Sequence, residues 1–199
     1  MIDNSLHVPI LHRYFFNEED NSYINVLNKE IDRLMDLNGD CWGRLDTEND
    51  TWSSYPINKD ILFNNPVFDD ASNGVKDIIN QYAMSVRADT QRHQIHMIDS
   101  SIYVCGSNPK KQYTFDDSQH FVGYIFLKAE EQSGNLIIRN PVAPKRRLHH
   151  NGDSPLREYF IKQVNTGDIV ILPSHIEHKM TDFSENSELR FVKFGITVA

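Results

Sequence analysis

The first half of the chain carries apolar residues at helical spacing, which predicts two amphipathic helices. The first helix follows the capping residues at positions 20–22 and ends near Gly39. Its apolar members are Ile24, Leu27, Ile31, Leu34 and Met35. The second helix begins near Ser72, and its apolar members are Val75, Ile78, Ile79, Tyr82 and Val86. We therefore expect residues 1–93 to be mostly helical.

The pattern changes near residue 94, where short β-branched and aromatic runs begin. Gly, Asn, Pro and Asp separate these runs, as they do strands that are joined by turns. The runs are IHMIDSSIYVCG (95–106), HFVGYIFLKA (120–129), GNLIIRNP (134–141), YFIKQVN (159–165), GDIVILPS (167–174) and LRFVKFGITV (189–198). Several strands after a helical half predict an antiparallel sandwich or barrel with the helices packed outside.

Length and composition favour a single globular domain over residues 1–199. The chain has 199 residues, of which 39% are hydrophobic and 24% are charged. No linker or internal repeat divides the sequence. The net charge of −8 argues against nonspecific binding of nucleic acid, which needs a surplus of Lys and Arg. We therefore expect no nucleic-acid partner.

The sequence is typical of a cytoplasmic protein. Its N-terminus, MIDNSLHVPI, has neither the basic nor the apolar region of a signal peptide. No apolar run approaches the roughly 20 residues that cross a bilayer. The 2 cysteines do not form the disulfide framework of a small secreted domain. We therefore expect a location in the cytoplasm and no membrane association.

Four segments of the second half occur in the order seen in one known family. They are FVGYIFL (121–127), SGNLIIRNP (133–141), GDIVILPSHIEHKM (167–180) and RFVKFGI (190–196). Together they resemble the core of the 2-oxoglutarate/Fe(II)-dependent oxygenases, and its small prolyl-hydroxylase-like bacterial and phage members in particular. TWSSYPINKDIL (51–62) resembles the Trp-Ser stretch before the second helix of the family.

The resemblance therefore covers nearly the whole chain and implies its fold. That fold is mainly β in an α+β arrangement. Its core, at residues 94–199, is a double-stranded β-helix, also called a jelly roll, of the cupin-like type. The helices of residues 1–93 are expected to pack outside this core.

The resemblance also implies a site that uses Fe(II), 2-oxoglutarate and O₂. Two histidines and one carboxylate hold such an iron on one face, and the open positions receive the 2-oxo acid and O₂. His178 stands at the place of the distal histidine, just beyond the run that ends in Pro173 and Ser174. Arg190, twelve residues further on, stands at the place of the arginine that binds the far carboxylate of 2-oxoglutarate.

The first metal motif of the family is altered in this chain. The motif is His-x-Asp or His-x-His, and counting back nine residues from Gly123 places it at Thr114, Phe115 and Asp116. Asp116 can serve as the carboxylate ligand. Thr114 stands where the first histidine is expected, and a neutral hydroxyl is a poor ligand for Fe(II).

Two neighbouring residues are alternatives in this motif. His120 can replace the first histidine only if residues 116–119 form a turn, because an extended strand would separate it from Asp116 by roughly 13 Å. Asp117 can replace Asp116 if the frame slips by one residue, which puts Phe115 in the histidine place.

Two functions of different classes remain open. The first is a dioxygenase, dependent on 2-oxoglutarate and Fe(II), that hydroxylates an organic substrate. The second is a jelly-roll binding module that has lost iron chemistry, and Thr114 favours it. A cupin-type metal enzyme is a weaker alternative, because its early strand would supply more than one histidine. Fold alone does not choose between a small molecule and a peptide as the substrate, and a homodimer is compatible with the sequence.

Overall fold

Eleven strands and four helical segments make up the described part of the chain. The computed structural model describes residues 2–3, 9–16, 21–37, 42–46, 51–55, 57–85, 94–106, 118–129, 135–141, 159–181 and 187–198. The strands are β1 (Ile2–Asp3), β2 (Ile10–Tyr14), β3 (Arg44–Asp46), β4 (Thr51–Ser53), β5 (Ile95–Cys105), β6 (Phe121–Lys128), β7 (Asn135–Arg139), β8 (Tyr159–Gln163), β9 (Asp168–Pro173), β10 (His178–Thr181) and β11 (Leu189–Val198). The helices are α1 (Asn21–Asp36), α2 (Ile61–Asn64), the short 3-10 helix η1 (Pro66–Phe68) and α3 (Asp69–Ser85).

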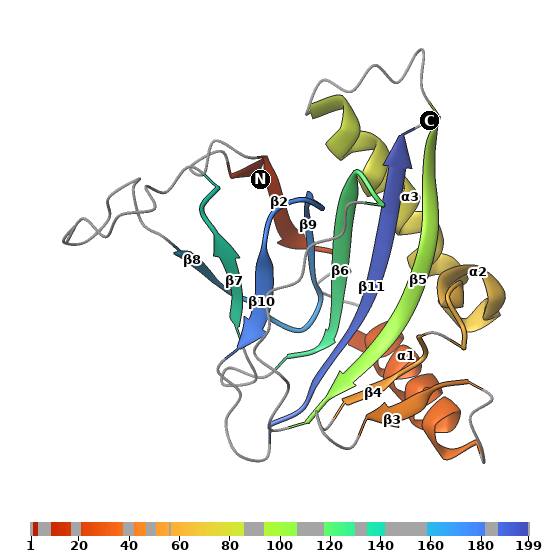
Figure 1. The fold of residues 1–199 in the computed structure, drawn as a ribbon. Helices are drawn as coiled ribbons and strands as arrows, with labels where there is room; N and C mark the ends of the chain where they lie inside the picture. The colour runs from red at the N-terminus through yellow and green to blue at the C-terminus, as the bar shows by residue number, and fades with distance from the viewer. Residues whose placement is uncertain are drawn as a thin grey trace.

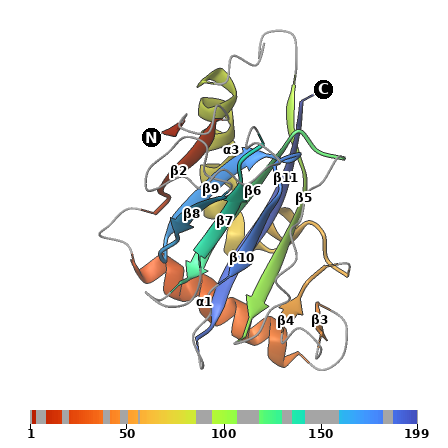
Figure 2. The same cartoon turned by 60° about the vertical axis from the view of Figure 1, so that its left-hand side comes forward.

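Two antiparallel sheets form the body of the fold. The larger sheet has eight strands in the order β1-β2-β9-β6-β11-β5-β4-β3, and the smaller sheet has three in the order β10-β7-β8. The smaller sheet lies along one face of the larger sheet, whereas α1 and α3 cover the other face (Figures 1 and 2). The predicted fold, a double-stranded β-helix with helices packed outside, is confirmed.

Each face of the larger sheet buries its own hydrophobic core. Val192 of β11 belongs to a cluster that includes Leu27 of α1. Phe191, the preceding residue of the same strand, belongs to a second cluster that includes Leu136 of the smaller sheet. Because successive side chains of a strand point to opposite faces, β11 separates the helical layer from the space between the sheets.

The helices lie close to their predicted positions. α1 covers residues Asn21–Asp36, as the first apolar series predicted. α3 begins at Asp69 rather than near Ser72, and the carboxylates of Asp69 and Asp70 in its first turn favour a helix N-terminus. None of the helices in the described part of the chain is both long and apolar enough to cross a membrane.

The N-terminal part also contributes strands to the larger sheet, which the helical pattern did not predict. β2 pairs with β9, and β4 pairs with β5. β2 has five residues and β4 has three. Their uninterrupted apolar runs, Ile10 and Leu11 in β2 and Trp52 alone in β4, are too short to be recognised as strands. These strands extend the larger sheet on both sides of the jelly-roll core.

A glycine in β6 allows an aromatic ring to lie directly against the sheet. Gly123 is the cross-strand partner of Phe194 in β11. A Cβ atom at position 123 would overlap the ring of Phe194. Phe194 is fully buried in the core that faces the helices, so the ring has little room to move aside.

Gly123→Ala is expected to lower the free energy of unfolding by about 1–3 kcal/mol, because the added methyl group overpacks this core. Urea titration of the two proteins measures the difference. Ile161→Ala is the control, since this β8 side chain is 63% exposed and its truncation should change stability little. A Gly123→Ala protein as stable as the parent would contradict the packing argument.

Candidate active site

The turn before β10 places His178 inside the jelly roll. β9 ends at Pro173, and the N–H of Ser174 then donates to the carbonyl of His120 at 3.1 Å. The N–H of Ile176 donates back to the carbonyl of Pro173 at 3.1 Å, which closes the turn. His178, the first residue of β10, is only 3% exposed.

Two hydrogen bonds define the tautomer of His178. Its Nδ1 lies 2.7 Å from the carbonyl oxygen of Ile176. A carbonyl oxygen can only accept, so Nδ1 carries the proton and Nε2 carries the lone pair. The hydroxyl of Tyr124 donates to Nε2 at 2.5 Å. Nε2 is therefore the atom of His178 that is able to bind a metal ion.

Burial keeps the imidazole of His178 neutral. The pKa of His178 is lowered to about 4, mainly by burial, while the hydrogen bond to Ile176 opposes the shift and the charge of Lys193 adds to it. At neutral pH the imidazole ring of His178 is therefore uncharged. A neutral imidazole whose second nitrogen donates to a backbone carbonyl is the usual state of a metal-binding histidine.

Lys193 lies beside this pair on the inner face of β11. It is the cross-strand partner of Tyr124 in β6 and of Ser101 in β5. Val192 and Phe194, its neighbours in sequence, pack toward the helices, so Lys193 faces the smaller sheet. Within the described residues its ammonium group has neither a hydrogen-bond nor an ion-pair partner.

The side chain of Lys193 lines a pocket of about 430 Å³. Strand β5 supplies one wall, and the segment between β4 and α2 supplies the outer rim. The lining residues are Tyr55, Lys59, Ile98, Asp99, Ser101, Tyr103, Ser118, Gln119 and Lys193. The pocket therefore lies on the side of β11 that faces the smaller sheet, and two of its side chains are lysines.

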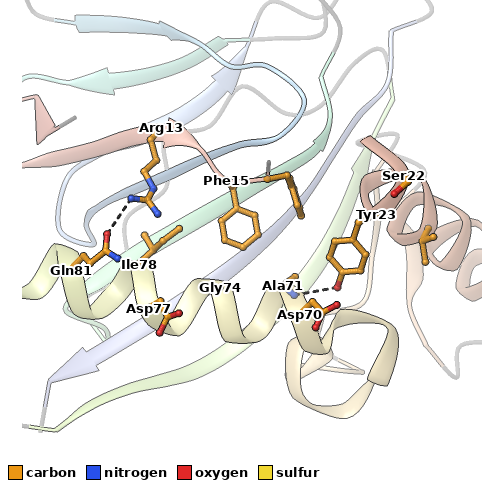
Figure 3. Close-up of a pocket in the computed structure, with 12 residues that line it drawn as sticks. Arg13, Phe15, Ser22, Tyr23, Asp70, Ala71, Gly74, Asp77, Ile78 and Gln81 are labelled. Carbon is orange, nitrogen blue, oxygen red and sulfur yellow. Dashed lines mark hydrogen bonds between the residues drawn. The ribbon is translucent and has the colours of Figure 1, made fainter. Parts of the chain in front are cut away.

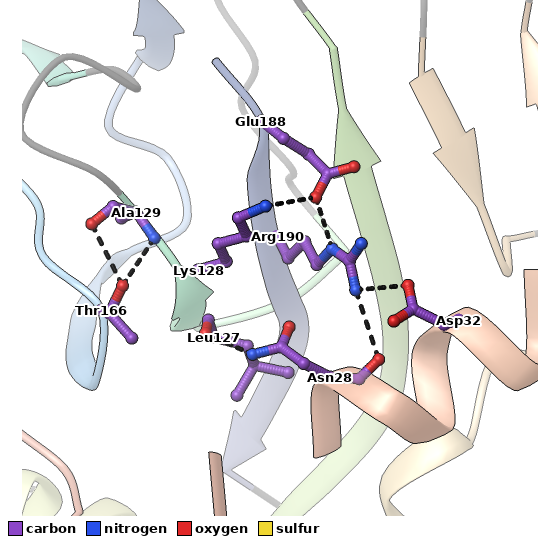
Figure 4. A network of polar contacts seen from close by, with 8 residues as sticks. All are labelled: Asn28, Asp32, Leu127, Lys128, Ala129, Thr166, Glu188 and Arg190. Atoms are coloured by element: carbon purple, nitrogen blue, oxygen red, sulfur yellow. Dashed lines mark hydrogen bonds and ion pairs between the residues drawn. The ribbon is translucent and has the colours of Figure 1, made fainter. Parts of the chain in front are cut away.

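Arg190 lies on the opposite face of β11, against helix α1 (Figure 4). Its guanidinium binds Glu188 through Nε at 2.7 Å and Asp32 of α1 through Nη1 at 2.7 Å. Nη1 also donates to the carbonyl of Asn28 at 3.2 Å. Only 11% of the side chain is exposed. The structure therefore does not bring Arg190 together with His178.

Glu188 strengthens this contact between β11 and α1. It accepts hydrogen bonds from Arg190 and from Lys128, the latter at 3.1 Å (Figure 4). Burial alone would raise the pKa of Glu188, but these two hydrogen bonds lower it below the ordinary value. The carboxylate is therefore ionised at neutral pH, and the group holds the helix to the sheet.

His120 is also placed apart from His178. It is exposed, and its Nδ1 lies 3.0 Å from the hydroxyl of Thr197 and accepts from the N–H of Val198 at 3.1 Å. Thr197 is four residues beyond Lys193 on β11, a separation of about 13 Å along a strand. The two imidazoles therefore have different neighbours, at different levels of the sheet.

The altered first metal motif falls outside the described residues. Thr114, Asp116 and Asp117 all lie in this part of the sequence. Within the described ranges, no group of three or more His, Cys, Asp or Glu side chains could hold a metal ion. Among the predicted ligands that the structure describes, His178 is the one whose burial and tautomer fit a metal ligand.

A second pocket, of about 600 Å³, lies on the helical side of the larger sheet (Figure 3). Phe15, just after β2, and Tyr23 of α1 line it, together with Gly74 of α3. At one end Arg13 donates to the side-chain amide oxygen of Gln81 at 3.2 Å. None of the predicted site residues that the structure describes lines either pocket. The pocket of Lys193 is the candidate active site because Lys193 is the cross-strand partner of Tyr124, whose hydroxyl binds His178.

Sequence reasoning missed Lys193, although a signal for it was present. Arg190 and Lys193 are three positions apart in RFVKFGI, and an odd separation on a strand puts two side chains on opposite faces. Only one of these two cations can therefore lie on the face of β11 that is turned toward His178. The alternation does not by itself say which one, because each is flanked by apolar residues.

Comparison with known proteins gives a match in structure and none in sequence. No family model and no curated protein matches the chain. A prolyl-4-hydroxylase from Pseudomonas putida is 8% identical, with 98% of this chain and 96% of that chain covered and a TM-score of 0.62. HygX from Streptomyces hygroscopicus, with nickel, 2-oxoglutarate and hygromycin B bound, is 11% identical, with 99% and 87% covered and a TM-score of 0.60.

A third structure extends the same likeness. An oxidoreductase of the 2OG-Fe(II) oxygenase family from Burkholderia pseudomallei is 12% identical, with 94% of this chain and 84% of that chain covered and a TM-score of 0.59. At such identities the likeness shows the fold, which is the jelly roll of the 2-oxoglutarate/Fe(II) oxygenase structures. What those proteins bind is a property of those proteins.

The stability of the fold is expected to decrease as the pH falls from about 6.5 toward about 4. In this range the unfolded chain binds a proton at position 178, whereas the folded protein keeps the buried imidazole neutral. The slope from this one group approaches about 1.4 kcal/mol per pH unit. Urea titrations across this range measure it, and His178→Gln should show a smaller slope. Equal slopes in the two proteins would contradict the buried neutral imidazole.

Proposed function

We propose that the protein is a 2-oxoglutarate- and Fe(II)-dependent dioxygenase that hydroxylates an organic substrate. One observation carries the proposal: Lys193, whose ammonium group has no ion-pair partner among the described residues, is the cross-strand partner of Tyr124, and the hydroxyl of Tyr124 binds the buried, neutral imidazole of His178. A candidate metal ligand on the smaller sheet and a cation on the larger sheet therefore face the same space between the two sheets. A 2-oxo acid needs both, since its keto-acid end binds the metal and its far carboxylate needs a counter-charge.

In this proposal, His178 and Asp116 hold the iron. The third ligand, in the place of the missing first histidine, is a water molecule or a further side chain. The hydrogen bond from Nδ1 of His178 to Ile176 supports the first assignment, because it fixes the ring and exposes Nε2. Asp116 is joined by a single residue to Ser118, which lines the Lys193 pocket. The bound iron would supply the activation of O₂.

Lys193, in place of the expected Arg190, takes the far carboxylate of 2-oxoglutarate. Arg190 already has two carboxylate partners on the helical side, whereas Lys193 has none among the described residues. A lysine binds a carboxylate as a point charge and not as a two-pronged fork. The hydroxyl of Tyr124, on the neighbouring strand, is placed to donate to the same carboxylate once it leaves Nε2 of His178.

A second candidate is a binding module that has kept the anion pocket and lost the iron. Thr114 favours it, because the first histidine of the family motif is missing. The hydroxyl of Tyr124 favours it as well, because this group occupies the lone pair of His178 that a metal ion would need. In this alternative Lys193 binds an organic anion without metal chemistry.

Lys193→Met is expected to weaken the binding of 2-oxoglutarate about 10- to 100-fold, because it removes a charge-assisted contact. Anaerobic addition of Fe(II) and 2-oxoglutarate should produce the metal-to-ligand charge-transfer band of a chelated 2-oxo acid, whose titration gives the affinity. Arg190→Met is the matched control. It should lower the melting temperature by releasing α1 and leave the affinity unchanged.

One result would count against the dioxygenase, and another would count against the role of Lys193. Absence of the band, together with no thermal stabilisation by Mn(II) plus 2-oxoglutarate, would favour the binding module. Loss of affinity in Arg190→Met, with full affinity in Lys193→Met, would return the co-substrate role to Arg190.

His178→Ala is expected to abolish the binding of Mn(II), because the imidazole is the metal ligand that the fold buries. Isothermal titration calorimetry without co-substrate measures the loss. His120→Ala is the control and should bind Mn(II) as the parent does, since its ring is held at the other end of β11. Equal affinity in His178→Ala and the parent would remove His178 from the site.

A further inference from the structure

We propose that the outer rim of the Lys193 pocket, formed by Tyr55 and Lys59, binds an anionic group of the organic substrate. The inference rests on the proposed function, in which Lys193 binds the co-substrate. It defines a substrate class: molecules that carry a carboxylate or a phosphate group next to an apolar or planar body.

The segment that carries the rim is fastened to strand β5. The N–H of Ser54 donates to the carbonyl of Ile102 at 3.1 Å, and the hydroxyl of Ser54 accepts from the N–H of Ile102 at 2.9 Å. The same hydroxyl donates to the carbonyl of Asn58 at 3.1 Å. The carbonyl of Lys59 accepts from the N–H of Ser100. These bonds fix the backbone on both sides of the rim, so a ligand meets a preorganised surface.

Lys59 is held over an aromatic ring, and it has no counter-charge among the described residues. Its ammonium nitrogen lies 4.9 Å from the centre of the Tyr55 ring. In the described part of the chain no carboxylate pairs with this ammonium group. The cation–π contact sets the position of the charge without neutralising it. An incoming anion is the partner that this arrangement lacks.

Within the described residues, no ion pair joins Lys59 to Asp99, the acidic residue of the pocket lining. The carboxylate of Asp99 accepts a hydrogen bond from the side-chain amide of Gln119 at 3.3 Å. When the co-substrate occupies Lys193, Lys59 is the remaining lysine of the pocket lining. Charge complementarity therefore selects a substrate with a negative group at the rim.

The same rim supplies apolar surface for the body of the substrate. Tyr55 is 47% exposed and Ile98 is 41% exposed, and both line the pocket. Exposed aromatic and aliphatic groups next to a fixed charge are typical of sites that bind an organic anion rather than a free inorganic ion. The rim can thus contact both the charged group and the apolar part of the substrate.

The experiment compares probes of equal shape and different charge. Benzoate, phenyl phosphate and benzamide are titrated, by amide NMR shifts, into protein saturated with Zn(II) and N-oxalylglycine. Benzoate or phenyl phosphate should shift the amides of residues 54–60 and 98–101 and bind at least about threefold more tightly than benzamide, as one partly exposed ion pair allows. The stronger of the two anions identifies the carboxylate or the phosphate as the recognised group.

Matched variants assign the effect to Lys59. Lys59→Met should remove the preference for the anions, and Lys59→Glu should reverse it in favour of the benzamidinium cation. Lys76→Met is the control, because the Lys76 ammonium lies 5.4 Å over the ring of Phe63 and neither residue lines the pocket. This variant should keep the full preference of the parent.

A parallel titration separates this inference from the proposed function. Benzoate is titrated into Lys193→Met without metal or co-substrate analogue, so that the rim is tested even if 2-oxoglutarate does not bind. Binding that is lost in the Lys59→Met, Lys193→Met double variant supports the rim. Equal affinity for benzoate and benzamide, an unchanged preference in Lys59→Met, or no shift at residues 54–60 would each overturn it.

Discussion

The alternation of side chains along β11 is the constraint on which the rest of the structure depends. This strand lies at the centre of the larger sheet, between β6 and β5. Every odd step along it crosses from the helical core to the space between the sheets. Val192 and Phe194 are held on the helical side by their burial in that core, and this fixes Lys193 on the other side. A slip of one residue would bury a lysine among the helices, so the register is strongly specified.

The two cations of β11 illustrate how charge is used on each side of such a strand. Arg190 is nearly buried, and its charge is balanced by Glu188 and Asp32, which is how a buried guanidinium is made compatible with a folded core. Lys193 has no such balance within the described residues, and it opens into a pocket. An unpaired cation facing a cavity adds nothing to stability. Its presence is explained when a ligand supplies the missing charge.

The sequence predicted the elements that have long, regular patterns, and it failed where the pattern was short or ambiguous. The helix at Asn21–Asp36 and the strands of the jelly roll follow directly from apolar periodicity. β2 and β4 were missed, because their pairing partners are distant in sequence and their own patterns are too short. For the site, the resemblance placed His178, just beyond Pro173 and Ser174, as the distal metal histidine, and its burial agrees with that place. Whether Arg190 or Lys193 faces the space between the sheets depends on which of the two hydrophobic cores contains Val192. Only tertiary packing determines that. The prediction for Asp116 stays a prediction.

Tyr124 connects the two halves of the proposed site. Its hydroxyl occupies Nε2 of His178, and its strand neighbour is Lys193. A metal ion at Nε2 has to displace this hydroxyl, which costs one buried hydrogen bond. A carboxylate bound at Lys193 would give the displaced hydroxyl of Tyr124 a new hydrogen-bond acceptor. This hydrogen bond would replace the one that the metal removes. In the proposed dioxygenase, the metal and the co-substrate would therefore assist each other's binding through one phenol, and by linkage the assistance would be equal in both directions.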